Sequence, residues 1–202
     1  MATQARRFDA EPPRVRERNV WMGVRLWTGA MAFLFTSFVF AFFYLRSLNN
    51  NGMWRDKAAS PPVVFGTIVL VCVIVGIALY AVGVRSLRSG AEGSWRSMSI
   101  LSVVLLLAAF VVQAIAWFHC GFGTKDGGYA SVFFGWTGFY SAVLLGSIYW
   151  LWTQVAQSLR GSGGSGDGGT PAYLADREAV AFFLYFMGIV QVALFILLYL
   201  IA

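Results

Sequence analysis

The chain has 202 residues, of which 58% are hydrophobic and 17% aromatic, while only 12% carry a charge. About a quarter of the residues of an ordinary soluble domain are charged, so this composition excludes that class and indicates a membrane protein. The formal net charge is +6, but no basic face or recognition motif accompanies it, which argues against nucleic acid as a partner.

Residues 1–19 form a polar segment that contains five arginines. We predict that this segment is a basic tail, either solvated or folded as a short helix on the membrane surface. We expect no cleaved signal peptide, because the first apolar run begins too late and is longer than the apolar region of a leader.

Five apolar runs follow, each close to or above the roughly 20 residues that a helix needs to cross the hydrocarbon core. They cover residues 20–45, 63–84, 98–118, 129–157 and 179–202. A Gly/Ser-rich loop at residues 161–170 has the composition of a flexible linker. The predicted fold is therefore all-α: a polytopic membrane protein in which residues 20–202 form a single bundle of five transmembrane helices.

An odd number of spans places the two ends of the chain on opposite sides of the membrane, and basic residues prefer the cytoplasmic side. Beyond the tail, Arg85, Arg88, Arg96, Arg160 and Arg177 lie on the same side as the first residues, against Arg46, Arg55, Lys57 and Lys125 on the other side. This bias predicts that the N-terminus is inside and the C-terminus outside.

The fourth run contains small residues of the kind that let transmembrane helices approach closely. They are Gly135, Gly138 and Gly146, among Ser131, Thr137, Ser141 and Ser147. We predict that they mark a face that packs against a neighbouring helix. In the second run, Gly76 and Tyr80 lie one turn apart and predict a smaller packing notch.

Tryptophans near the ends of the runs are typical of anchors at the membrane–water interface. They are Trp21, Trp54, Trp95, Trp117, Trp150 and Trp152. Arg25 lies near the edge of the first run, where its guanidinium can extend to the lipid headgroups. A contact with a lipid phosphate or with a buried partner is the alternative for this residue.

Every acidic residue lies outside the five runs. Pumps and ion-coupled transporters place ionisable groups within the membrane, so we expect this chain not to conduct ions or protons. Its single histidine, His119, lies beside Cys120, and these two side chains are too few for a metal or haem site. We therefore expect the chain itself to bind no metal or cofactor and to carry no catalytic residue.

Four stretches resemble, in order and spacing, subunit III of the haem–copper respiratory oxidases, in its short form of five helices. Residues 42–46 read FFYLR, similar to an aromatic run of that family that closes in YLR. Gln113 and Trp117 match its Gln-x-x-x-Trp. Residues 129–139, with Gly146 after them, are similar to its YGSxFFxLTGFH, and residues 194–200 read LFILLYL, similar to its closing LFxLLYL.

The ionisable groups of that family are missing from the matching positions. Met31 stands where the family has a membrane-embedded glutamate, and Ala116 where it has another glutamate before the tryptophan. Tyr140 and Val143 stand where it has paired histidines, and residues 184–188 keep only the phenylalanine of its WHFVD. The resemblance thus extends to the framework, and the roles of those groups in proton uptake or lipid binding do not transfer.

The resemblance implies a non-catalytic accessory subunit III of a cytochrome c or quinol oxidase in the plasma membrane of a bacterium. Its partners would be the catalytic subunit I, which would hold the haem and copper, the other oxidase subunits, and bound phospholipids. The candidate residues for lipid or partner packing are Arg25, Tyr44, Arg46, Gln113, Trp117, Thr137, Gly138 and Gly146. The alternatives are a related component of a nitric oxide reductase, a small transporter or channel acting alone, and an assembly factor.

Overall fold

The computed structural model describes residues 12–49, 54, 61–159 and 171–201. Its long helices are α1 (Pro13–Ser47), α2 (Val63–Arg88), α3 (Glu92–Phe118), α4 (Gly128–Leu159) and α5 (Pro171–Phe195). A π-helical segment, η1 (Ile196–Ile201), continues α5. Within the described residues, five helices are long and apolar enough to cross a membrane, which confirms the prediction of an all-α fold with five candidate spans.

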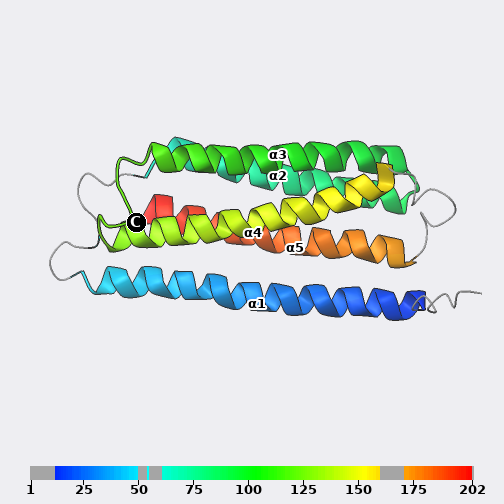
Figure 1. The fold of residues 1–202 in the computed structure, drawn as a ribbon, viewed down its shortest axis with the longest axis horizontal. Helices are drawn as coiled ribbons and strands as arrows, with labels where there is room; N and C mark the ends of the chain where they lie inside the picture. Colours follow the sequence, from blue (N-terminus) through cyan, green and yellow to red (C-terminus); the bar gives the residue numbers. More distant parts are fainter. Residues whose placement is uncertain (1–11, 50–53, 55–60, 160–170, 202) are drawn as a thin grey trace, which may run out of the picture.

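The helices run side by side in alternating directions, so that α1 begins at one end of the bundle and η1 finishes at the other (Figure 1). α4 and α5 occupy the middle, the α2–α3 hairpin lies on one side of them, and α1 lies on the other. The main contacts of α1 are with α5 and α4. The place of α1 in the bundle therefore depends on these two helices.

Three helices begin well before the starts that hydropathy predicts, and one of them is α3, which begins at Glu92 instead of residue 98. α1 starts at Pro13, inside the predicted tail, because proline suits the first helical position, where no backbone donor is needed. α5 starts at Pro171 for the same reason, so it carries Asp176, Arg177 and Glu178 in its early turns instead of in a loop. Residues 1–11 of the predicted tail and the predicted linker at 161–170 lie outside the described residues.

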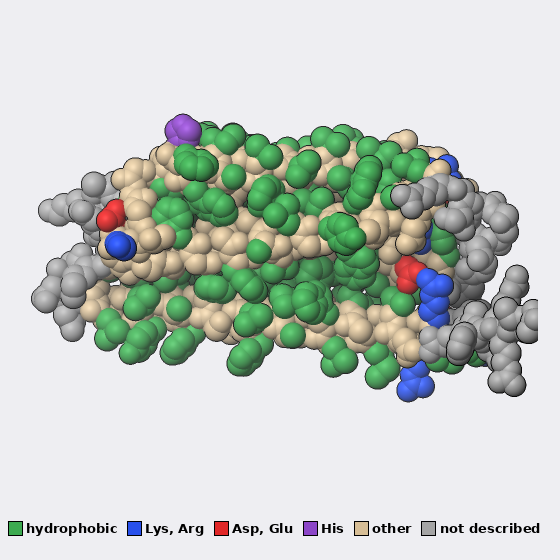
Figure 2. Space-filling model, viewed as in Figure 1, with side chains coloured by type: hydrophobic (Ala, Val, Ile, Leu, Met, Phe, Trp, Pro, Cys, Tyr) green, Lys and Arg blue, Asp and Glu red, His purple; other side chains and the backbone are tan. Residues whose placement is uncertain are grey.

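Charged side chains gather at the two ends of the bundle, and the surface between them is apolar on the face that Figure 2 shows. At the end where α1 begins, Arg16 pairs with Asp176 (2.8 Å) and Arg88 pairs with Glu178 (2.7 Å), so α1 and α2 are both tied to the start of α5. An apolar belt between two charged ends indicates a multi-pass membrane protein.

α2 packs against its neighbours through glycines. A Cβ at Gly76 would lie 3.2 Å from the Leu106 side chain of α3, and a Cβ at Gly83 would lie 3.2 Å from Met98. The two helices therefore approach more closely than larger residues would allow. This confirms the packing notch predicted at Gly76. Tyr80, one turn later, faces α5 instead, and its hydroxyl donates to the backbone oxygen of Arg177 (3.2 Å).

The small residues of α4 do not share one face, so the prediction of a single packing face is wrong. Thr137, Ser141 and Ser147 are buried in the bundle, whereas Gly135 and Gly146 are exposed. At 3.6 residues per turn, these two sets lie on opposite sides of the helix. Gly135 lies beside Phe38 of α1, and Gly146 lies where α4 faces α1. The glycines are therefore on the side of α4 that faces α1, and the hydroxyl side chains face the centre of the bundle.

Candidate functional site

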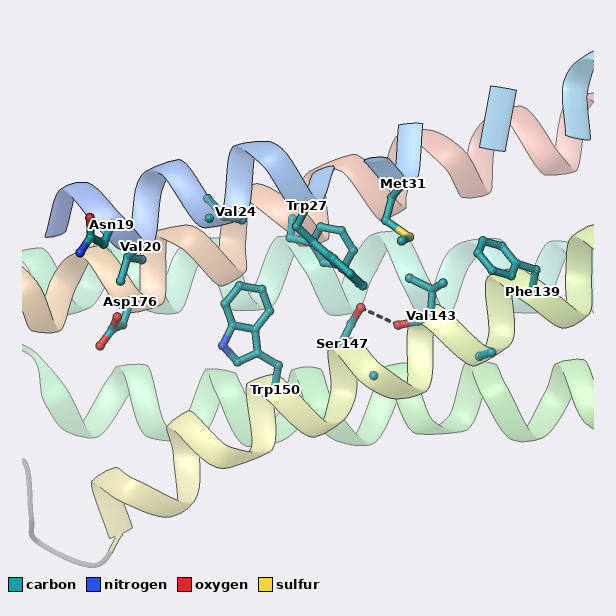
Figure 3. A pocket seen from close by; sticks show the side chains of 14 residues that line it. Asn19, Val20, Val24, Trp27, Met31, Phe139, Val143, Ser147, Trp150 and Asp176 are labelled. Carbon is teal, nitrogen blue, oxygen red and sulfur yellow. Dashed lines mark hydrogen bonds between the residues drawn. The ribbon is translucent and has the colours of Figure 1, made fainter. Parts of the chain in front are cut away.

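An apolar cleft of about 830 Å³ lies between α1 and α4, with α5 behind it. Figure 3 shows Trp27 and Met31 of α1 facing Val143 and Trp150 of α4 across this space. Gly23 and Gly146 also line it, and neither glycine would bring a Cβ within 4 Å of another group. The cleft is therefore open at these two positions, because glycine has no side chain to fill it.

The length of the cleft along α1 is similar to the thickness of the hydrocarbon layer of one membrane leaflet. Its lining on α1 runs from Asn19 to Met31, twelve residue steps of a helix that rises about 1.5 Å per residue, or about 18 Å. Half of the hydrocarbon core of a bilayer is about 15 Å. Asn19 and Asp176 lie at one end of the lining (Figure 3). The apolar cleft therefore has a polar opening at this end, which we call its mouth.

The polar groups at this mouth are held in place. Arg16 of α1 donates to the Asp176 carboxylate of α5 at 2.8 Å, and Asn19 lies three residues after Arg16, on the same side of α1. Deeper in the cleft, the Ser147 hydroxyl donates to the Val143 backbone oxygen at 2.8 Å (Figure 3). The body of the cleft can therefore hold an apolar chain but offers no group suited to catalysis.

Two of the positions at which the sequence departs from subunit III meet in this cleft. Met31 and Val143 both line it, on α1 and α4 respectively. In the resemblance drawn from the sequence motifs, these are the positions of a glutamate and a histidine. The departures are therefore neighbours in space, and together they make the wall of the cleft apolar.

Three of the eight candidate residues lie together near the other end of the bundle. The Trp117 indole nitrogen of α3 donates to the Thr137 hydroxyl of α4 at 3.0 Å, and that hydroxyl donates to the Phe133 backbone oxygen at 2.6 Å. Gln113 is buried one turn before Trp117, and its side chain faces the Tyr199 hydroxyl of η1. This group joins α3, α4 and η1.

The other candidate residues lie apart. Arg25 is exposed, with its guanidinium 5.5 Å from the ring centre of Trp21. Tyr44 is half exposed and stacks on Phe40, and the guanidinium of Arg46 lies 5.9 Å from the ring centre of Phe42. Gly146 lines the cleft, and Gly138 has nothing within 4 Å of an added Cβ. The eight residues therefore form no single site.

Sequence reasoning missed the residue with the most unusual environment, Arg177. It was predicted to be a loop cation, yet only 2% of its surface is exposed, and its guanidinium lies 5.0 Å from the ring centre of Trp95. Trp95, predicted to be an interface anchor, is completely buried. A signal was present in the sequence, because Tyr173 lies four residues before Arg177 and so on the same face of a helix.

The described residues contain no group of three or more His, Cys, Asp or Glu side chains that could hold a metal ion. The His119 ring packs against Phe65, with ring centres 5.6 Å apart. Burial raises the pKa of the Cys120 thiol to about 11, and the thiol donates to the Ala116 backbone oxygen. Cys120 is therefore a neutral thiol at physiological pH.

We expect Trp117→Phe to remove the hydrogen bond between α3 and α4 while keeping an aromatic ring in place. Such bonds contribute about 0.6 kcal/mol on average between membrane helices and at most about 1.7 kcal/mol. The free energy of unfolding should therefore fall by about 0.5–1.5 kcal/mol in a denaturant titration followed by tryptophan fluorescence. Thr137→Val should have a similar effect, and the double variant should lose little more than either single variant. Trp152→Phe, at an exposed site, is the control, and an equal loss there would contradict the assignment.

A scan against protein-family models found no match for this chain, and a search of the curated proteins found none either. The resemblance to subunit III therefore rests on the sequence motifs alone.

Proposed function

We propose that this chain is a non-catalytic accessory subunit III of a haem–copper respiratory oxidase in a bacterial plasma membrane, with its N-terminus inside. The observation that carries the proposal is the apolar cleft between α1 and α4, whose wall includes Met31 and Val143. Apart from Asp176 at its opening, the wall has no ionisable group. Such a wall suits packing and lipid binding, and it does not suit conduction or chemistry.

In this function the cleft holds a phospholipid. An acyl chain lies along the apolar lining, and the headgroup meets Arg16, Asn19 and Asp176 at the mouth. The filled cleft completes the contact of α1 with α4 and α5. Gly146 leaves room for the acyl chain, because it has no side chain to fill the cleft.

The experiment that tests this function is purification of the whole complex through a tag on residues 1–11, after mild extraction of the membrane. We expect a large haem-bearing subunit to co-purify and a reduced-minus-oxidised optical spectrum to show haem bands. The same strain with an untagged chain is the control.

The spectrum also separates the alternatives. Bands and turnover of an oxygen-reducing enzyme support the proposal, whereas nitric oxide turnover identifies the related reductase component. A solitary, colourless protein would overturn both and leave the transporter and the assembly factor. Of these, the transporter has the weaker support, because the acidic residues lie outside the predicted spans.

A further inference from the structure

Arg177 is the only charged side chain that is buried among the residues that the structure describes. An arginine keeps its charge in proteins, and a buried charge without a partner is strongly destabilising. The two acidic residues beside it are already paired, Asp176 with Arg16 and Glu178 with Arg88. Neither carboxylate accepts a hydrogen bond from the Arg177 guanidinium.

Two aromatic rings lie against this guanidinium. Its central carbon lies 3.3 Å from the ring centre of Tyr173 and 5.0 Å from that of Trp95, distances at which a cation is attracted by the π-face of a ring. The rings hold the planar group in one orientation. A ligand can therefore approach it only along its edges.

One edge of the guanidinium is used and one is not. Nη1 donates to the Tyr173 backbone oxygen at 3.0 Å. Nε has no hydrogen-bond partner, and no described residue accepts from Nη2. Nε and Nη2 together present two parallel donors, the arrangement that binds two oxygens of a carboxylate or phosphate at once.

α3 carries two further buried donors without partners, one of them on the Trp95 ring that lies against this guanidinium. The indole nitrogen of Trp95 and the hydroxyl of Ser99 are both fully buried and have no hydrogen-bond partner. Ser99 follows Trp95 by one helical turn, so the two side chains lie on the same face. Buried donors normally have an acceptor. Here α3 and α5 carry several buried donors without an acceptor, and one of these donors belongs to a cation.

We propose that Arg177, with Trp95 and Ser99 beside it, forms a binding site for an oxyanion of the phosphate class, held through Nε and Nη2. The site lies at the end of the bundle where α1 begins, with the Arg16 and Arg88 ion pairs beside it. Both free phosphate and the phosphodiester of a lipid headgroup have the required two oxygens. The proposal involves this chain alone, so it stands or fails independently of the oxidase function.

The test is thermal unfolding of the full chain in an uncharged detergent, with sodium phosphate compared with sodium chloride at equal ionic strength. A ligand present at about a hundredfold excess over Kd raises the melting temperature of a chain of this size by roughly 5–10 °C. We expect this rise for the wild type, and its loss in Arg177→Lys, which keeps the charge but lacks the two-donor edge. Arg88→Gln, at an exposed ion pair, should keep the full rise.

A second arm replaces phosphate by phosphatidylglycerol mixed into the detergent, with diacylglycerol as the lipid that lacks the phosphodiester. Stabilisation by phosphatidylglycerol alone would identify a lipid headgroup as the ligand, and stabilisation by inorganic phosphate would identify a free anion. If neither stabilises the wild type, or if Arg177→Lys responds equally, the site does not exist. The comparison of phosphate with chloride, and of phosphatidylglycerol with diacylglycerol, on the wild-type chain decides whether an anion binds even if an Arg177 variant fails to fold.

Discussion

Replacing Gly66 with alanine is expected to lower the free energy of unfolding by about 1–3 kcal/mol, the usual cost of overfilling a packed core. A Cβ at this position of α2 would lie 2.6 Å from the Cε1 and Cζ atoms of the Tyr199 ring. That ring cannot easily turn away, because it stacks on Phe195 and meets Phe133 edge-on, with ring centres 5.4 and 5.8 Å apart. The added methyl group must therefore separate α2 from η1.

The measurement is a denaturant titration in detergent, followed by circular dichroism so that no tryptophan needs to report on the site. Gly138→Ala is the matched control, because no atom lies within 4 Å of a Cβ there. Alanine also favours a helix over glycine, by up to about 1 kcal/mol, so this variant should be as stable as the wild type or more stable. Equal destabilisation by both variants would rule out a specific contact between Gly66 and Tyr199.

Phe35→Ala is expected to loosen α1 from the bundle. Phe35 is 4% exposed, and its ring centre lies 5.4 Å from that of Phe139, 6.2 Å from that of Tyr140 and 6.1 Å from that of Phe186. Truncating a buried phenylalanine in a soluble protein costs about 3–5 kcal/mol. In lipid the transfer of apolar surface from water contributes nothing between helices, so we expect a loss of about 2–4 kcal/mol from lost packing.

Phe33→Ala provides the comparison for this loss, because the Phe33 side chain is 79% exposed on the same helix. Its truncation should change the free energy of unfolding by less than about 0.5 kcal/mol. Limited proteolysis of both variants gives an independent reading, since a detached α1 should be cleaved from the bundle sooner. A Phe33 effect as large as that of Phe35 would mean that α1 is held through its outer face, and not through α4 and α5.

The two predictions concern the same property of this chain. Its helices are apolar on nearly every side, so hydrophobicity alone cannot hold one against another in a bilayer. Stability must come from close contacts such as Gly66 with Tyr199, from aromatic clusters such as that around Phe35, and from hydrogen bonds such as Trp117 with Thr137. For the same reason, an incompletely filled space such as the cleft is open to lipid.

Hydropathy predicted the five candidate spans and the all-α fold, because a long apolar run is a local property of the sequence and helices satisfy every backbone group within the run. Motif spacing also selected Trp117 and Thr137, which the structure joins by a hydrogen bond. The residues selected with them were dispersed over the bundle. A motif fixes positions along the chain, and it does not fix the direction in which each side chain points.

What the tertiary structure decided is the rotation of each helix about its axis and the choice of its neighbours. That rotation turns Gly135 and Gly146 toward α1 while Ser141 faces the centre of the bundle, and it buries Arg177 against Trp95. The sequence of a membrane helix carries little information on this rotation, because the side that faces lipid is as apolar as the side that faces protein. Only the fit of particular side chains between helices distinguishes the two sides, and that fit depends on residues far apart in the chain.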